Sequence, residues 1–408
     1  MDSRTGLPVV GMVGGGQLAR MTHQAAIALG QSLRVLALSP DDGAALVAAD
    51  VQIGAHTDLS ALRTFAKGCD VVTFDHEHVP EAHIRTLAAE GVAIHPSADA
   101  LVFAQDKRRM RERLAALGAP VPRWAPVTSA ADVEAFAASA GWPVILKAAR
   151  GGYDGRGVWK ITGPAEAAAL FATDSAQPTS SATTAGGGEL PAAAAVLAAG
   201  GELIVEELVP LRRELAVQVA RSPFGQVAAY SVVETVQRDG ICVEVLAPAP
   251  LLPEDLAVEA QKLAIDIATA LGVVGMLAVE LFETPGGLVV NELAMRPHNS
   301  GHWTIEGART SQFEQHLRAV LDYPMGDTAL TAPVVVMANV LGGPAGGMST
   351  DERLHHLFAE DPGARVHLYG KQSRPGRKIG HVTVLGDDLA SVRARAARAA
   401  WWLREGSQ

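Results

Sequence analysis

Short apolar runs alternate with longer segments of helical periodicity over residues 8 to 95. Runs such as "PVVGMV" (8–13) and "CDVVTFD" (69–75) predict strands, as do residues 32–38 and 92–96, and the segments between them predict helices. This alternation predicts a doubly wound, largely parallel sheet. Because ligands bind at the carboxyl edge of such sheets, the loops after "GMV" and "VVTF" should lie together there.

The pattern changes beyond residue 104. It predicts a helix over 104–118, two strands joined by a glycine-rich loop over 141–161, antiparallel strands over 213–248, a helix from about Asp255 to Leu271 and a hairpin over 275–297. Residues 174–200 are mostly Ala, Gly, Ser and Thr, which indicates a surface insertion. From about residue 330, short strands surround a small helix, and an amphipathic helix ends the chain.

Composition narrows the class of protein. The chain has 408 residues, of which 48% are hydrophobic and 19% charged, so it predicts several domains with sizeable cores. Its net charge of −10 argues against a nucleic-acid partner. Cys69 and Cys242 belong to no metal or redox spacing, which favours reduced, buried thiols. No signal peptide or membrane-length apolar run is recognisable, so we expect a soluble cytoplasmic protein without a membrane partner.

The segment "GMVGGGQLARM" carries a glycine fingerprint. Gly14, Gly16 and Ala19 satisfy G-x-G-x-x-[GA], which places backbone N–H groups near an anion at a helix N-terminus. Three interpretations stay open at this point: a nicotinamide dinucleotide, another phosphate ligand, or a tight turn without a ligand.

The hairpin predicts a metal site. Folding its strands about "TPGG" (284–287) places Glu280 opposite Glu292 on one face, and two carboxylates in such a position repel each other. A divalent cation removes this repulsion, and oxygen ligands with room for phosphate oxygens suit Mg²⁺. Asn291 can add an amide oxygen. The alternative is a pair of glutamates on a solvated face.

Three further segments carry polar groups of possible function. Lys147 ends an apolar strand just before the loop "GGYDGRG", which can close over phosphates. The turn "YGKQSRPGRKIGH" concentrates four cations in an acidic chain, which favours a phosphate clamp over a solvated loop; they are Lys371, Arg374, Arg377 and Lys378. The segment after the hairpin resembles a substrate loop and contains Arg296, His298, Asn299 and Ser300.

The segments "GGGQLARM", "GGYDGRG", "NELAMRPHNSGHWT" and "YGKQSRPGRKIGH", in this order, resemble the ATP-grasp superfamily, and within it the 5-(carboxyamino)imidazole ribonucleotide synthases. The resemblance covers about residues 9 to 385, apart from 174–200. It implies an α/β chain with an ATP-grasp fold in three parts. These are a doubly wound pre-ATP-grasp domain (1–103), an ATP-grasp domain (104–328) and a small α+β domain that binds the substrate phosphate (329–408).

The resemblance also implies site residues. ATP would be bound by Lys107, Lys147, Gly152, Tyr153, Asp154, Gly155, Arg156, Gly157, Val158, Glu206, Glu207, Leu208, Val209, Glu214, Gln237, Asn291 and Glu292. The ribonucleotide would be bound by Gln17, Leu18, Glu77, His298, Lys371, Arg377 and Lys378. Mg²⁺ would be held by Glu280, Glu292 and Asn291, and catalysis would fall to Lys147, Asp154, Arg156 and His298. Lys107 stands where relatives commonly have Arg, and Gln237 where many have His.

The implied reaction uses ATP and bicarbonate to carboxylate 5-aminoimidazole ribonucleotide through carboxyphosphate, and relatives suggest a homodimer. Three alternatives remain: an ATP-grasp enzyme that activates formate for glycinamide ribonucleotide, an NAD-dependent dehydrogenase, and a non-catalytic nucleotide sensor. The dehydrogenase leaves the pair of Glu280 and Glu292 unexplained, and a sensor has no need to keep both carboxylates.

Overall fold

The computed structural model describes residues 1–151, 157–172, 193–343 and 347–406. It begins with a parallel sheet in the order β3-β2-β1-β4, as the alternating pattern predicts. The strands are β1 (Val9–Val13), β2 (Ser32–Ala37), β3 (Asp50–Ile53) and β4 (Val71–Phe74), and the helices are α1 (Gln17–Ala28), α2 (Leu59–Ala66) and α3 (Glu81–Ala89). The strand predicted over 92–96 is reduced to an isolated bridge between Val72 and Ile94. The prediction missed β3, because this edge strand is largely exposed and lacks an apolar run.

The helix predicted over 104–118 is divided. It consists of the end of α4 (Ala98–Gln105) and of α5 (Lys107–Ala116), separated by Asp106. The Asp106 carboxylate accepts the backbone N–H of Arg109 and so caps α5, which is a frequent role of Asp at helix starts. This break places Lys107 at the first position of a helix, where its backbone N–H donates to the carbonyl of Ala149 in the second lobe.

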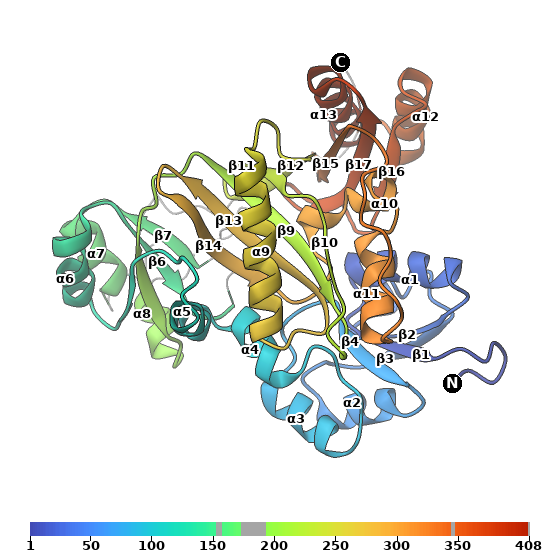
Figure 1. The fold of residues 1–408 in the computed structure, drawn as a ribbon, viewed down its shortest axis with the longest axis horizontal. Helices are drawn as coiled ribbons and strands as arrows, with labels where there is room; N and C mark the ends of the chain where they lie inside the picture. Colours follow the sequence, from blue (N-terminus) through green and yellow to red (C-terminus); the bar gives the residue numbers. More distant parts are fainter. Residues whose placement is uncertain (152–156, 173–192, 344–346, 407–408) are drawn as a thin grey trace.

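A small antiparallel sheet forms this second lobe (left in Figure 1). Its strands lie in the order β5 (Trp124–Val127), β8 (Leu203–Glu207), β6 (Val144–Ala148) and β7 (Val158–Ile161), beside α6 (Ala130–Ala140), α7 (Pro164–Phe171) and α8 (Ala193–Ala198). The pairing of β6 with β7 confirms the predicted two strands around a glycine-rich loop. Most of the predicted insertion (174–200) lies outside the described residues, namely residues 174–192. The end of the predicted insertion is not a surface segment. Ala193 is buried in the core of this lobe, and Val196 and Leu197 pack against that core.

The large antiparallel sheet extends through the centre of the molecule. Within the described ranges it has nine strands, of which eight follow the order β14-β13-β9-β11-β12-β15-β17-β16 and β10 pairs with β9. They are β9 (Arg213–Arg221), β10 (Val227–Ala229), β11 (Val233–Arg238), β12 (Ile241–Ala247), β13 (Gly275–Thr284), β14 (Gly287–Ala294), β15 (Val334–Leu341), β16 (Arg365–Leu368) and β17 (Lys378–Gly386). Since β12 pairs with β15, the C-terminal strands continue the central sheet.

Helices cover this sheet and join it to the first one. α9 (Glu254–Ala270) lies across β9 and β13, while α12 (Thr350–Glu360) and α13 (Leu389–Glu405) lie at the C-terminal end (Figure 1). Between β14 and β15 come η1 (Asn299–Gly301), α10 (Thr304–Gly307) and α11 (Gln312–Val320). On α11 the buried His316 contacts the Thr73 hydroxyl of β4 at 2.9 Å and accepts the Met276 N–H of β13, so it links the two sheets.

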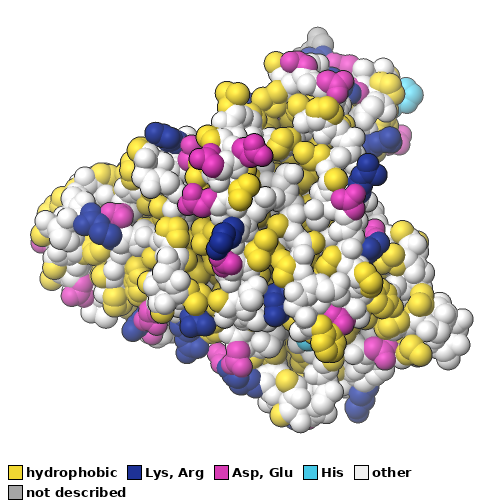
Figure 2. Space-filling model, viewed as in Figure 1, with side chains coloured by type: hydrophobic (Ala, Val, Ile, Leu, Met, Phe, Trp, Pro, Cys, Tyr) yellow, Lys and Arg dark blue, Asp and Glu magenta, His cyan; other side chains and the backbone are white. Residues whose placement is uncertain are grey.

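Surface charge is mixed on the face drawn in Figure 2. Lys and Arg side chains lie among Asp and Glu, with hydrophobic side chains between them. Within the described ranges, none of the helices has the length and apolar character needed to cross a membrane.

Candidate active site

A cleft of about 1480 Å³ lies where the three sheets meet. It brings together predicted residues from every part of the chain. Those that line it are Gln17, Leu18, Glu77, Lys107, Lys147, Val158, Glu206, Glu207, Leu208, Val209, Glu214, Gln237, Glu280, Asn291, Glu292, His298, Lys371, Arg377 and Lys378. The predicted residues Gly152, Tyr153, Asp154, Gly155 and Arg156 lie outside the described residues. Gly157 immediately precedes β7.

The predicted glutamate pair is present at what we call the glutamate end of the cleft, formed by Glu280, Glu292, Lys107 and Lys147. Glu280 pairs directly with Glu292 across β13 and β14, as counting from the turn predicts. The register then shifts by one residue, which leaves Asn291 unpaired as a β-bulge. Neighbouring residues of a regular strand point to opposite faces, so the bulge explains how Asn291 and Glu292 both line the cleft.

The two carboxylates differ in electrostatic environment. Burial, together with the charges of Glu292 and Glu214, raises the pKa of Glu280 to about 8. Burial acts in the same direction on Glu292, but Lys107 and Lys147 outweigh it and lower the pKa of that carboxyl. Lys107 Nζ lies 2.9 Å from Glu292 Oε1. The site therefore disfavours two negative charges side by side, and a bound cation would relieve their repulsion.

The residues of the glutamate end could supply some, but not all, of the ligands of a Mg²⁺ ion. Glu280, Glu292 and the amide oxygen of Asn291 are hard oxygen donors on one wall of the cleft. In the described part of the chain, no group of three or more His, Cys, Asp or Glu side chains could hold a metal on its own. Oxygens of a bound phosphate and water would therefore have to complete the shell, which is typical of Mg²⁺ in nucleotide sites.

Lys147 is held in place by a buried ion network. Its Nζ lies 2.7 Å from Glu206 Oε2 and donates to Asn291 Oδ1 at 3.3 Å. The other oxygen of Glu206 accepts from Nε of Arg111, a fully buried residue, at 2.7 Å. Burial raises the pKa of Glu206, but the two cations more than offset it, so the carboxyl stays ionised. The side chain of Glu206 thus positions Lys147, while its backbone belongs to the strand expected beside adenine.

Sequence reasoning missed Arg111. It lies one helical turn after Lys107 on α5, so both cations face the same side of that helix. In the sequence, Arg111 is one of several charged residues in the run "KRRMRER". Most of them are solvated, so nothing in the run distinguishes the buried arginine.

The remaining predicted nucleotide residues lie along β8, β9 and β11. Glu207 pairs with Arg123 at 2.6 Å, and Leu208 is 45% exposed at the cleft. Burial raises the pKa of Glu214, and a hydrogen bond from Gln237 opposes that rise. Gln237, which departs from the family pattern, therefore supports Glu214.

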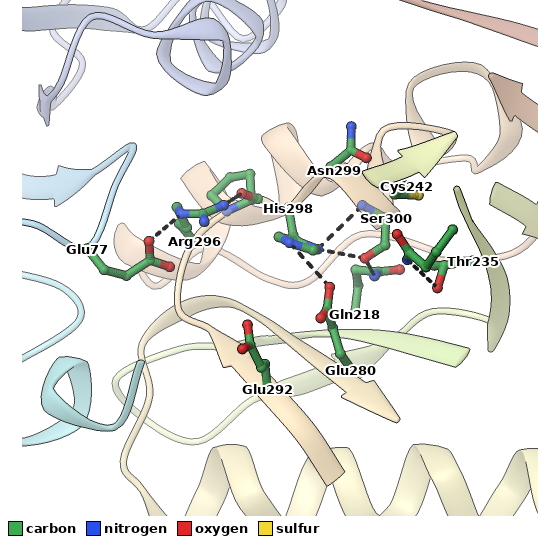
Figure 3. A network of polar contacts seen from close by, with 12 residues as sticks. Glu77, Gln218, Thr235, Cys242, Glu280, Glu292, Arg296, His298, Asn299 and Ser300 are labelled. Carbon is green, nitrogen blue, oxygen red and sulfur yellow. Dashed lines mark hydrogen bonds and ion pairs between the residues drawn. The ribbon is translucent and has the colours of Figure 1, made fainter. Parts of the chain in front are cut away.

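The segment after β14 forms a polar network in the middle of the cleft (Figure 3). Arg296 Nε donates to Glu77 Oε2 at 2.7 Å, which joins this segment to the first sheet. His298 contacts Ser300 Oγ through Nδ1 at 2.8 Å, and its Nε2 lies 3.5 Å from Glu280 Oε1. Burial and the nearby cations lower the pKa of His298 well below its usual value, so the ring is neutral.

The glycine fingerprint and the basic turn meet at the opposite, glycine-loop end of the cleft, formed by Gln17, Asp75 and Lys371. Nζ of Lys371 donates to the side-chain oxygen of Gln17, 354 residues earlier in the chain. The resemblance assigns residues of both segments to the ribonucleotide, and the structure brings the two segments into contact. A smaller cavity of about 280 Å³ lies beside them, with Asp42 and Arg377 among its lining residues.

The structure shows one anion at the glycine loop. The fingerprint predicts backbone N–H groups close to an anion, and Gly16 N–H donates to the carboxylate of Asp75, with Oδ2 at 2.6 Å. A Cβ at Gly14, where φ is +111°, would overlap the same carboxylate, so glycine is required for this close approach. Burial raises the pKa of Asp75 to about 6. An internal carboxylate thus occupies the position that a dinucleotide pyrophosphate takes in this fingerprint, which argues against a dehydrogenase.

The comparisons with known proteins agree with this geometry. Family models match residues 7–105 (ribonucleotide synthetase preATP-grasp domain), 112–313 (ATP-grasp domain) and 335–395 (phosphoribosylaminoimidazole carboxylase C-terminal domain). Fold and cleft therefore define an ATP-grasp enzyme.

Individual relatives narrow the class. The chain is 60% identical over 403 residues to N5-carboxyaminoimidazole ribonucleotide synthase of Mycobacterium tuberculosis, covering 98% of this chain and 88% of that protein. The Corynebacterium ammoniagenes enzyme is 48% identical, with 98% and 92% covered. This chain belongs to the N5-carboxyaminoimidazole ribonucleotide synthase family, which confirms the resemblance inferred from its motifs.

Solved structures give the same result. The synthetase of Thermus thermophilus superposes with a TM-score of 0.81 at 37% identity, covering 97% of this chain and 98% of that one. The Aspergillus clavatus enzyme in complex with ADP and 5-aminoimidazole ribonucleotide gives 0.82 at 31% identity, with 97% and 98% covered.

Proposed function

We propose that this chain carboxylates 5-aminoimidazole ribonucleotide with ATP and bicarbonate, a step in de novo purine synthesis. The observation that carries the proposal is that the glutamate end and the glycine-loop end belong to the same cleft. The glutamate end offers Mg²⁺ ligands and Lys147, and the glycine-loop end offers Lys371 beside Gln17. The Mycobacterium and Corynebacterium relatives, which match nearly the whole chain, carry the name of this synthase, and neither is named for formate activation.

The first chemical step transfers phosphate to bicarbonate. A bicarbonate oxygen attacks the γ-phosphorus of ATP, the bond to ADP breaks, and carboxyphosphate forms. Lys147, fixed between Glu206 and Asn291, offsets negative charge on the transferring group. Mg²⁺, held by Glu280, Glu292 and Asn291, would neutralise phosphate charge when bound.

The second step forms the carbon–nitrogen bond. The exocyclic amine of the ribonucleotide attacks the carboxyl carbon, phosphate leaves, and the amine loses one proton. Catalysis here depends on orienting the acceptor. Lys371, Arg377 and Lys378 hold its phosphate, and Glu77, itself fixed by Arg296, contacts its sugar or base.

We further propose the domain bounds 1–103, 104–328 and 329–408, a homodimeric assembly and a cytoplasmic location.

The experiment is an ADP-release assay on the purified chain. ADP release should require bicarbonate and Mg²⁺ and rise strongly when 5-aminoimidazole ribonucleotide is added. Release driven by formate and glycinamide ribonucleotide instead would contradict the proposal.

A further inference from the structure

His298 lies between groups of different hydrogen-bonding character in the middle of the cleft (Figure 3). Its Nδ1 faces Ser300, with Oγ at 2.8 Å and the backbone N at 3.4 Å. Its Nε2 faces Glu280 Oε1 at 3.5 Å. A neutral imidazole carries one proton, and the nitrogen that holds it decides whether the ring donates or accepts toward the cleft.

Ser300 offers hydrogens to Nδ1. Its backbone N–H can only donate, so this contact requires an unprotonated Nδ1. Its hydroxyl oxygen accepts from Gln218 Nε2 at 2.8 Å, which leaves the hydroxyl hydrogen to point at Nδ1. A proton on Nδ1 would oppose the backbone N–H and would force the hydroxyl hydrogen to turn away from the ring.

The supporting pair is buried. Gln218 is completely buried on β9, and Ser300 is 2% exposed in η1. Gly301 follows Ser300, and a Cβ at that position would overlap Oε1 of Gln312 and lie 3.0 Å from Cγ of Gln218. The glycine therefore leaves room for both glutamine side chains beside Ser300.

We propose that Gln218 and Ser300 are positioning residues that keep Nδ1 of His298 unprotonated and so hold the ring as the Nε2–H tautomer. His298 then offers a hydrogen to oxygen atoms on the Glu280 side of the cleft. In this state Nε2 has no lone pair with which to take the proton of the amine. Resting on the proposed function, this suits His298 to orient a bicarbonate or carboxyphosphate oxygen rather than to act as the resting general base.

The opposing influence is the carboxyl group of Glu280. If it were protonated and donated to Nε2, it would force the proton of His298 onto Nδ1. The test must therefore read the tautomer directly, in protein without metal or substrates, so that its result does not depend on which reaction the enzyme performs.

The experiment is long-range ¹H–¹⁵N NMR of histidine-labelled protein at pH 7, with His298→Gln to assign the signal. The wild-type protein should show protonated Nε2 and unprotonated Nδ1. Ser300→Ala and Gln218→Met should each move part of the population to the Nδ1–H form. Ser222→Ala, which removes a buried hydroxyl that has no partner in the described part of the chain, should leave the tautomer unchanged.

Kinetics give a second readout. Ser300→Ala should lower kcat roughly tenfold, the usual effect of one lost hydrogen bond, with the KM for ATP unchanged. An Nδ1–H tautomer in the wild-type protein, or an unchanged tautomer in both variants, would overturn the proposal. Because the NMR result needs no turnover, it stands apart from a failure of the proposed reaction.

Discussion

The glutamate end and the glycine-loop end of the cleft, each of which we propose holds a phosphate, are built differently. At the glutamate end, lysines form close ion pairs with glutamates: Lys107 with Glu292, and Lys147 with Glu206. At the glycine-loop end, Asp75 fills the loop, and Lys371 reaches Gln17 from the far end of the chain. The glutamate end is thus fixed by one buried and one half-buried ion pair, whereas the glycine-loop end depends on how two distant segments pack.

This difference predicts that changes at the glutamate end affect folding and chemistry, while changes at the glycine-loop end affect substrate binding. The largest effect should come from Arg111. Arg111→Met leaves Glu206 buried with one cation instead of two, and loss of a partner from a buried pair costs about 3–5 kcal/mol. Denaturant unfolding measures this. Arg123→Met, which breaks the exposed pair with Glu207, should cost no more than about 1 kcal/mol.

Glu292→Gln should leave the fold intact and lower turnover by about a hundred- to a thousandfold, because it removes a charged ligand at the transferring phosphate. Ribonucleotide binding, measured by calorimetry, should survive. The matched control is Glu259→Gln on the exposed side of α9. Turnover near the wild-type rate at ordinary Mg²⁺ would discard the metal assignment.

If Lys371 and Arg377 hold the ribonucleotide phosphate as proposed, Lys371→Ala and Arg377→Ala should each raise the KM for the ribonucleotide roughly ten- to a hundredfold, because each would remove a charged hydrogen bond. The KM for ATP should change little in steady-state kinetics. Lys262→Ala, an exposed lysine on α9, is the control. A loss of ATP affinity instead would move the basic turn to the nucleotide site.

The smallest effect concerns pH and Asp75. Its folded pKa of about 6 lies above the ordinary value of 3.8, so folding favours the protonated form. The contribution of Asp75 to stability is therefore largest at low pH and falls as pH rises from about 4 through 6. Between pH 5 and pH 7 the wild-type protein should lose about 1 kcal/mol relative to Asp75→Asn. Parallel stability curves for the two proteins would show that Asp75 titrates normally.

The same contrast explains what the sequence could predict. The pairing of Glu280 with Glu292 follows from counting along one hairpin, because register is a local property. The bulge at Asn291 and the helix break at Asp106 could not be predicted by counting residues. Each depends on local hydrogen bonds that tertiary contacts decide. Asp75 was visible at a strand end, but only the folded sheet shows that it enters the glycine loop. Gln218 gave no signal, because an interior polar residue on a strand resembles an exposed one in sequence.

Both ends of the cleft should act on one reaction. The most direct measurement supplies ¹³C-bicarbonate, ATP, Mg²⁺ and 5-aminoimidazole ribonucleotide and follows the labelled carbon by ¹³C NMR while ADP is quantified. We predict a new carbamate carbon on the ribonucleotide, formed in equal amount to ADP. ADP release without a labelled carbamate, or a carbamate formed at the uncatalysed rate when enzyme is present, would show that the two ends do not act on one reaction.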